Sequence, residues 1–330
     1  MSITKNLEFL SRKQAQDFLS SFDVVMSDCD GVIWYLQKPI PGAIDTLKRL
    51  QELGKSLYLV TNNGTNSIDK YCETLKLNRL EVKPEQVITP GKVVSWYLKK
   101  IHFTEEAFVI ASTPFRQTLI DAGIKLSPEN LEVDEDDVFA SIKSLEDRPS
   151  IKAVVVDFSV VFNWAKIAFA ISCLKRNDVL YLCGAQDEWI TYDIDKKILG
   201  PGPLIEIITK QSGRTPIECA KPSEVLKSYL FDLCNVKDSK RCLFIGDTIN
   251  YDMKFGTMCG FQKLMVGTGL DNIKDAELNE EIRPDFYIPS LALLHPIIDS
   301  LQDGIVNERN GSWHQNSSMF NENNKNLRRA

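Results

Sequence analysis

The chain has 330 residues, of which 43% are hydrophobic and 25% are charged, a composition typical of globular proteins and not of disordered ones. Its 45 acidic and 39 basic residues give a formal charge of −6, so neither nucleic acid nor an anionic membrane is expected as a partner. The three histidines lie far apart in the sequence and are too few for a histidine-rich metal site. Any acid–base or ligand chemistry is therefore expected to depend on carboxylates.

The eight cysteines show no spacing that indicates a metal or redox motif. No two of them are arranged as C-x-x-C, and a chain of this length does not depend on a disulfide framework. Residues 1–22 carry charges throughout and lack the apolar core of a signal peptide. The longest apolar stretch, 151–162, is shorter than the roughly 20 residues of a membrane span. We therefore expect free thiols and a cytoplasmic protein.

The first third of the chain alternates short apolar runs with a segment of helical period. Residues 23–28 predict a first buried strand, and leucines at helical spacing predict a helix over 44–53 that ends at Gly54. Residues 56–61 predict a second strand. The three elements together predict a right-handed βαβ unit.

The middle third has a βαβ pattern of its own. Residues 107–110, 153–156 and 179–183 are strand-like, and the acidic stretch 127–149 predicts a helix and loop at the surface. A helix is predicted between the last two strands. Its expected apolar face comprises Trp164, Ile167, Ala168, Ile171 and Leu174. This block is therefore expected to fold as an inserted domain.

Two more core strands are predicted near the other end of the chain, at 242–246 and 263–267. The alternation of strands and helices predicts an α/β fold with a doubly wound, mainly parallel sheet. We expect a discontinuous core domain, an inserted domain and a disordered tail. Their expected ranges are 1–101 and 214–303 for the core, 102–213 for the insertion and 304–330 for the tail.

Four polar motifs end predicted strands or lie in a loop before a helix. They are Asp-Cys-Asp-Gly at 28–31, Thr-Asn-Asn-Gly at 61–64, Lys-Pro at 221–222 and Gly-Asp-Thr-Ile-Asn-Tyr-Asp at 246–252. Each motif alone is ordinary turn composition, but their combination in this order is much rarer. Ligands of open parallel sheets bind at the carboxyl ends of the strands. The motifs therefore predict one site with paired carboxylates and donors suited to phosphate oxygens.

The chain resembles the haloacid dehalogenase superfamily of phosphatases over roughly residues 18 to 300. Within it, the chain most resembles the branch of 4-nitrophenylphosphatases, phosphoglycolate phosphatases and the chronophin-like pyridoxal phosphate phosphatases. The resemblance rests on Asp28-Cys-Asp-Gly-Val-Ile-Trp34, Pro41-Gly-Ala43, Val60-Thr-Asn-Asn63 and Gly200-Pro-Gly202. It implies a Rossmann-like core, an inserted α/β cap, a bound Mg²⁺ and an aspartyl-phosphate intermediate.

The resemblance also implies a role for each motif residue. Asp28 is the expected nucleophile and a metal ligand, and Asp30 is the expected general acid and base, with its backbone carbonyl on Mg²⁺. Asp247 is the expected further ligand, and Asp252 is expected to orient the metal shell or Lys221. The residues expected to hold the phosphoryl oxygens are Thr61, Asn62, Asn63 and Lys221. A metal is chemically reasonable here because an aspartate would otherwise repel a phosphate dianion.

The chain departs from the family pattern in three places. The motif at 246–252 lacks the Arg-Leu-x-Thr that is commoner between its two aspartates, although both aspartates are present. Ala220 stands where relatives usually have glycine before the lysine, which requires a negative φ at that residue. The cap segment 183–192 also differs, with Asp187, Trp189 and Tyr192 as expected cap contacts. The motifs therefore predict the chemistry and leave the identity of the leaving group open.

The leading hypothesis is a Mg²⁺-dependent phosphatase of small phosphate monoesters. Its expected substrates resemble phosphoglycolate or pyridoxal phosphate, with 4-nitrophenyl phosphate as a substrate in vitro. A non-catalytic or weakly catalytic binding or scaffold protein and a phosphoprotein phosphatase remain alternatives. A dinucleotide site is excluded because the first βα turn lacks G-x-G-x-x-G. The resemblance also suggests a homodimer formed through the cap.

Overall fold

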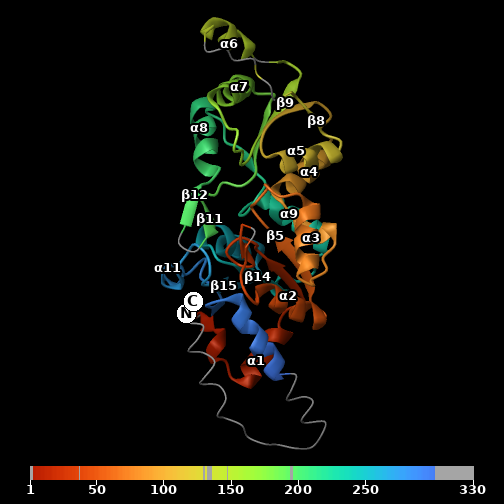
Figure 1. Ribbon diagram of the computed structural model, residues 1–330, viewed down its shortest axis with the longest axis vertical. Coiled ribbons are helices and arrows are strands. Elements are labelled where there is room, and N and C mark those ends of the chain that lie inside the picture. The colour runs from red at the N-terminus through yellow and green to blue at the C-terminus, as the bar shows by residue number, and fades with distance from the viewer. Residues whose placement is uncertain are drawn as a thin grey trace, which may run out of the picture.

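The computed structural model describes residues 3–36, 38–128, 131, 136–146, 148–193 and 196–301, so the tail expected at 304–330 lies outside the described residues. A seven-stranded sheet and a five-stranded sheet organise this part of the chain, the first in the lower half and the second in the upper half of Figure 1. The strand pairs of both sheets are parallel. The expected parallel α/β fold is therefore confirmed.

The first sheet has the strand order β1-β16-β15-β14-β2-β5-β6. These strands are β1 (Lys5–Asn6), β2 (Val24–Ser27), β5 (Ser56–Val60), β6 (Val87–Ile88), β14 (Cys242–Gly246), β15 (Gln262–Val266) and β16 (Phe286–Ile288). The four core strands expected from the sequence are all present within one residue or two of their predicted ends. The short edge strands β1 and β6 and the strand β16 were not predicted, because two or three residues show no periodicity.

The second sheet has the order β13-β10-β9-β7-β8. Its strands are β7 (Glu106–Ile110), β8 (Lys125–Leu126), β9 (Ile151–Val156), β10 (Leu180–Cys183) and β13 (Ile217–Glu218). Two antiparallel pairs are separate from it, β3 (Trp34–Tyr35) with β4 (Lys38–Pro39) and β11 (Trp189–Asp193) with β12 (Lys196–Leu199). Strand β13 lies beyond residue 213 but pairs with β10, and the division into core and cap domains stays a prediction.

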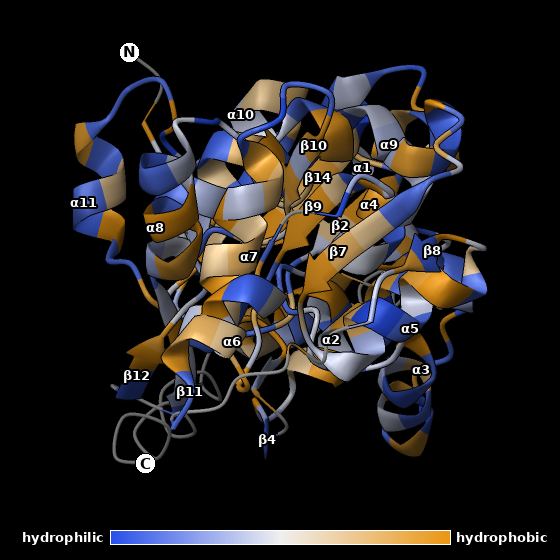
Figure 2. Ribbon diagram, turned by 90° about the horizontal axis from the view of Figure 1, so that it is seen from above, coloured by the Kyte–Doolittle hydropathy of each residue, from blue (hydrophilic) through white to orange (hydrophobic). Residues whose placement is uncertain are grey.

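Helices cover both faces of the first sheet because alternate side chains of a strand point to opposite sides. In β14, Leu243 and Ile245 pack on one side and Phe244 packs on the other. The helices of the first side are α1 (Arg12–Ser20), α2 (Ala43–Glu52) and α3 (Ile68–Leu77). Those of the second side are α4 (Pro90–Lys100), α9 (Glu224–Cys234) and α10 (Lys254–Cys259). In Figure 2 the strands at the centre are orange and the blue segments lie mostly on the surrounding helices.

The apolar cluster on the second side also contains residues of the five-stranded sheet. Val109, Val155 and Leu182 belong to it, together with the buried face of α5 (Thr113–Asp121). The opposite face of this sheet packs against α7 (Trp164–Leu174) and α8 (Gly202–Ser212). A continuous hydrophobic core therefore connects the two sheets.

Further short helices complete the described part of the chain. They are α6 (Val138–Ser144), α11 (Ile273–Leu278), the 3₁₀ helices η1 (Leu7–Phe9), η2 (Pro84–Gln86), η3 (Ser239–Arg241) and η5 (Leu291–Leu293), and the π-helix η4 (Ile249–Met253). Helix α6 lies within the surface excursion expected at 127–149, part of which is outside the described residues.

The predicted apolar face of α7 was wrong except at Leu174, which is buried. Trp164 is exposed, and Ile167, Ala168 and Ile171 are only partly buried. The buried residues of this helix are Ala165, Lys166, Phe169, Ala170, Cys173 and Leu174. The helix is apolar on most of its surface, so its periodicity did not distinguish the two faces. The packing of Phe169 against Phe108 of β7, with ring centroids 4.8 Å apart, identifies the buried face.

The expectation of free thiols is confirmed, since all eight cysteines are free and six are buried. Burial raises the pKa of Cys29 well above its usual value, and the charges of Asp28 and Asp30 raise it further. This thiol is therefore held in its neutral form. Within the described residues, no helix has both the length and the apolar character needed to cross a membrane.

A buried carboxylate follows β9 where the two sheets approach each other. Asp157 is 2% exposed, and one of its oxygens accepts a hydrogen bond from the backbone N–H of Phe158 at 2.7 Å. Its other oxygen has no partner among the described residues. A Cβ on Gly64 or Gly184 would lie 2.9 or 2.7 Å from this carboxyl group, so these glycines make room for it. Burial raises the pKa of Asp157 to about 8, and the charge of Asp187 adds to the effect.

We expect Asp157 to make the protein less stable as the pH rises. Between pH ~4 and pH ~8 the unfolded chain has lost this proton while the native carboxyl keeps it, so the free energy of unfolding falls with pH. The free energy of unfolding of Asp157→Asn, measured relative to that of the wild type, should therefore rise by about 2 kcal/mol from pH 5 to pH 7. Urea unfolding of both proteins at the two pH values measures this change.

The matched control is Asp69→Asn on α3, where the aspartate is exposed. Its stability should follow that of the wild type at both pH values. If the difference in the free energy of unfolding between wild type and Asp157→Asn is the same at pH 5 and pH 7, the carboxyl group of Asp157 does not titrate as described.

Candidate active site

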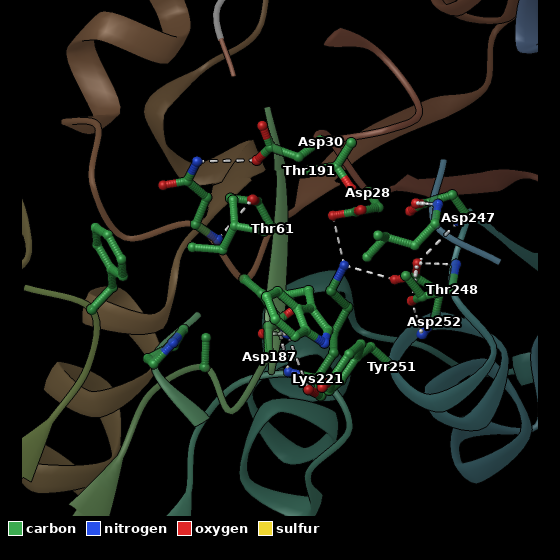
Figure 3. A pocket seen from close by; sticks show the side chains of 18 of the residues that line it. Asp28, Asp30, Thr61, Asp187, Thr191, Lys221, Asp247, Thr248, Tyr251 and Asp252 are labelled. Atoms are coloured by element: carbon green, nitrogen blue, oxygen red, sulfur yellow. Dashed lines mark hydrogen bonds and ion pairs between the residues drawn. The ribbon is translucent and has the colours of Figure 1, made fainter. Parts of the chain in front are cut away.

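Three neighbouring strands bring the sequence motifs to one edge of the first sheet. Strand β2 lies between β14 and β5, and all three run in the same direction. The residues that follow them, Asp28, Asp247 and Thr61, therefore lie side by side. All eight residues predicted for the site line one pocket (Figure 3): Asp28, Asp30, Thr61, Asn62, Asn63, Lys221, Asp247 and Asp252. The pocket has a volume of about 630 Å³, which includes space open to solvent.

Lys221 forms a buried ion-pair network with two of the aspartates. It is 3% exposed, and its ammonium group donates to Asp28 Oδ1 at 2.6 Å and to Asp252 Oδ1 at 2.7 Å (Figure 3). Burial alone would lower the pKa of Lys221, but the two carboxylates outweigh it and raise the pKa above its ordinary value. The side chain is therefore a fixed positive charge. Ala220, which replaces the expected glycine, is not among the residues with positive φ.

Asp252 is fully engaged by hydrogen bonds from the protein. Besides the contact with Lys221, its Oδ2 accepts from the backbone N–H groups of Asp247 and Thr248, at 3.0 and 3.1 Å, and from the Thr248 hydroxyl at 2.7 Å. These contacts form because Asp252 lies in the π-helix η4, directly after β14. The side chain holds the loop and Lys221 in place, and its oxygens have little capacity left for a metal.

Asp28 and Asp247, the other two aspartates of this cluster, fit a divalent cation. Asp28, Asp247 and Asp252 each have an oxygen within 4.8 Å of the others. Asp247 Oδ2 accepts from the N–H of Leu270 at 2.9 Å, whereas its buried Oδ1 has no partner among the described residues. Burial raises the pKa of Asp28 and of Asp247, and the charge of Asp252 raises both further, because a single lysine has to compensate three carboxylates. A further positive charge would relieve this imbalance, and oxygen ligands are those that Mg²⁺ prefers.

Asp30 lies beside the pair Asp28 and Lys221 and is held by an amide. The side-chain N–H of Asn63 donates to Asp30 Oδ2 at 3.1 Å, and Asp30 Oδ1 has no partner among the described residues. Burial raises the pKa of Asp30 to about 6, although the hydrogen bond from Asn63 opposes the shift. This carboxyl can therefore gain and lose a proton near neutral pH, as a general acid and base must.

The two asparagines make contacts within the protein that the sequence did not predict. Asn62 Nδ2 donates to the backbone oxygen of Lys221 and Asn62 Oδ1 accepts from its N–H, which fixes the lysine loop. Asn63 Oδ1 accepts from the hydroxyl and the N–H of Thr65. Thr61 Oγ1 accepts from the N–H of Asn63 at 3.0 Å, and its hydroxyl also makes side-chain contacts with Cys29 and Tyr71.

The segment after β10 closes the pocket from the side of the second sheet. Asp187 Oδ2 accepts from Asn62 Nδ2 at 2.8 Å. The hydroxyl of Tyr251 donates to the backbone oxygen of Gln186 at 3.3 Å and accepts from the N–H of Glu188 at 3.2 Å. Of the expected cap contacts, Asp187 and Trp189 line the pocket, whereas Tyr192 is not among its lining residues.

Sequence reasoning missed Tyr251 and Thr248, although both lie inside the motif at 246–252. Tyr251, an aromatic residue between Asp247 and Asp252, indicated a contact other than metal binding. It could not show that the contact would be with a loop some 60 residues earlier in the chain, because only the packing of the second sheet brings that loop here.

Two family descriptions match the chain. Residues 25–125 match the haloacid dehalogenase-like hydrolases, and residues 218–294 match a second HAD-hydrolase-like description. The first segment contains the pocket residues from Asp28 to Asn63, and the second contains Lys221, Asp247 and Asp252. Together the segments make up more than half of the chain.

Relatives and a solved structure agree with these matches. The chain is 28% identical to phosphoglycolate phosphatase 1A, chloroplastic, of Arabidopsis thaliana, over 85% of this chain and 78% of that protein. It is 28% identical to 4-nitrophenylphosphatase of Schizosaccharomyces pombe, over 86% of this chain and 97% of that protein. The crystal structure of glycerol phosphate phosphatase from Mycobacterium tuberculosis in complex with magnesium has the same fold, with a TM-score of 0.67 and 20% identity over 83% of this chain and 76% of that one.

The resemblance on which the sequence analysis relied is therefore confirmed at the level of the family. The matched segments span both halves of the first sheet, and each of them contributes carboxylates to the same pocket. From its sequence and its fold, the chain belongs to the haloacid dehalogenase-like hydrolases.

Proposed function

We propose that this protein is a Mg²⁺-dependent phosphatase that hydrolyses small phosphate monoesters through a phosphorylated Asp28. The observation that carries the proposal is the surroundings of Asp28, whose carboxylate pairs with Lys221 and lies within 4.8 Å of the carboxylate of Asp247. The phosphatases among its relatives support the same reaction class.

Asp28, Asp247 and the backbone carbonyl of Asp30 are the groups proposed to hold the metal. The unpartnered Asp247 Oδ1 and the excess of carboxylates over cations support this assignment. Mg²⁺ bound there would neutralise the charge of a phosphate dianion and so reduce its repulsion by the nucleophile. Asp252 is proposed to position Lys221 and the loop after β14, because its own oxygens are occupied.

The proposed reaction has two steps, each carried by residues of the pocket. In the first, a carboxylate oxygen of Asp28 bonds to phosphorus, the bond to the leaving oxygen breaks, and Asp30 gives that oxygen its proton. In the second, the Asp30 carboxylate takes a proton from water, whose oxygen attacks the phosphorus and releases phosphate and free Asp28. Two of the three N–H donors of Lys221 are bound to aspartates, and the third has no partner among the described residues and can donate to a phosphoryl oxygen. The Thr61 hydroxyl is proposed to contact the same phosphoryl group.

Replacing the nucleophile gives the direct test. Asp28→Asn retains the size of the side chain but cannot form the phosphorylated intermediate, so we expect the hydrolysis of 4-nitrophenyl phosphate in Mg²⁺ to fall by at least about a thousandfold. The conversion of Asp17 on α1, which is exposed, to asparagine is the matched control and should retain full activity. Equal rates for wild type and Asp28→Asn, or full activity in excess chelator, would falsify the proposed mechanism.

The loop at 186–188 lies on the pocket and favours small substrates over a folded phosphoprotein. Tyr251 holds this loop through two hydrogen bonds, each contributing on the order of 1 kcal/mol. We expect Tyr251→Phe to raise KM for 4-nitrophenyl phosphate about fivefold and to change kcat less than about twofold, because the hydroxyl closes the loop and touches no reacting atom.

Tyr229→Phe on α9 is the matched control, since this ring packs against Trp96 and does not line the pocket. Steady-state kinetics of the two variants separate a specific effect from a general one. An unchanged KM for Tyr251→Phe would mean that the hydroxyl does not hold the loop closed during turnover.

We also propose that two copies of the chain associate through the cap. Exposed apolar side chains support this proposal: Val160, Val161 and Trp164 follow β9 at the start of α7, and Val160 is 87% exposed. Light scattering is expected to give the mass of a dimer for the wild type and of a monomer for the double variant Val160→Glu and Val161→Glu. A monomeric wild type at micromolar concentration would refute the association.

A further inference from the structure

The part of the pocket away from the phosphate-binding groups has a distinct composition. Phe158, Trp189 and Ile190 come from the second sheet and the hairpin β11–β12, and they provide an apolar wall. In Figure 3, Asp187 and Thr191 lie around the same space as Lys221 and Asp28. The leaving group of a substrate whose phosphate contacts Asp28 would therefore meet these side chains.

The charges that line the pocket as a whole are one-sided. Five aspartates line the pocket, and Lys221 is the only cationic side chain among the described residues that line it. Lys221 is already paired with Asp28 and Asp252. Among the described residues that line the pocket, Asp187 is the one charged residue from the segment after β10, and its Oδ2 accepts a hydrogen bond from Asn62. Burial raises the pKa of Asp187 to about 6, so the group is mainly ionised at pH 8.

We propose that this half of the pocket selects phosphate esters whose leaving alcohol or phenol carries no negative charge. A carboxylate or a second phosphate on the leaving group would approach Asp187, and the described lining residues offer it no cation besides Lys221, which serves the phosphoryl group. The partly desolvated site would strengthen the repulsion. An uncharged ring or alkyl group would instead gain contact with Phe158, Trp189 and Ile190. The inference rests on the proposed phosphatase function and names its substrate class.

Thr191 provides the polar contact of this subsite. Its side chain is 9% exposed, and its Oγ1 has no partner among the described residues although it lines the pocket. A hydroxyl can donate to or accept from an uncharged polar substituent, and a buried hydroxyl without a partner is costly. Thr191 therefore fits a hydroxyl or carbonyl group on the leaving group, in keeping with the absence of a cation.

Two substrates with the same ring test the selection by charge. Phenyl phosphate and 4-carboxyphenyl phosphate differ only in the carboxylate, which makes the phenol a somewhat better leaving group and so favours the charged ester chemically. We expect kcat/KM of the wild type at pH 8 to be at least about tenfold lower for 4-carboxyphenyl phosphate. Equal or higher kcat/KM for the carboxylate would overturn the inference.

Removing the charge of Asp187 shows whether this residue is responsible. Asp187→Asn retains an oxygen acceptor for Asn62, and we expect it to reduce the ratio of the two kcat/KM values at least about fivefold. Asp178→Asn changes an exposed aspartate outside the pocket, next to Lys152, and should leave the ratio as in wild type. An unchanged ratio in Asp187→Asn would overturn the assignment of the selection to Asp187.

Binding to the Asp28→Asn protein separates this inference from the proposed function. Calorimetric titration with each ester in Mg²⁺ should give a dissociation constant at least about tenfold higher for 4-carboxyphenyl phosphate. Selective binding without turnover by the wild type would support the subsite and contradict the phosphatase function. Turnover of both esters with equal binding would support the function and contradict the subsite.

Discussion

The buried ammonium group of Lys221 is the interaction on which the rest of the site depends. It joins Asp28, at the end of β2, to Asp252, in the π-helix after β14, and its own backbone is fixed by Asn62, after β5. Segments separated by nearly 200 residues are thus connected through one charge. Loss of one partner from such a buried pair leaves an uncompensated charge and costs about 3–5 kcal/mol. The lysine therefore stabilises the loops of the site as well as contributing to its charge.

The same network leaves the site short of positive charge. Three carboxylates lie around one lysine, and they differ in the number of hydrogen bonds that they accept from the protein. Asp252 is satisfied by the protein, whereas Asp247 keeps a buried oxygen without a partner in the part of the chain that the structure describes. The arrangement is costly for the protein alone, and the proposed metal and phosphate would offset this cost. A site with such an excess of negative charge is typical of centres that bind a metal.

The second sheet packs against the first and supplies a different kind of side chain to the pocket. A shared apolar cluster holds the two sheets together, and a few hydrogen bonds from Asn62 and Tyr251 place the loop at 186–188 over the pocket. The phosphate end is thus built from polar loops of one sheet, and the far end mostly from apolar side chains attached to the other. Asp157 shows that this contact includes an energetically unfavourable feature, a buried carboxyl group packed against Gly64 and Gly184.

The sequence by itself determined the parallel α/β fold, the main strands and the eight polar residues that meet in one pocket. Apolar runs report burial, and motifs after parallel strands must meet at one edge of the sheet, so both could be inferred without coordinates. The tertiary structure alone decided which face of α7 is buried, that Asp252 is saturated while Asp247 is not, and that Tyr251, Asp157 and Asp187 meet the opposite sheet. These features depend on contacts between distant segments and on the number of hydrogen bonds that each oxygen receives. Local patterns in the sequence carry no information on either.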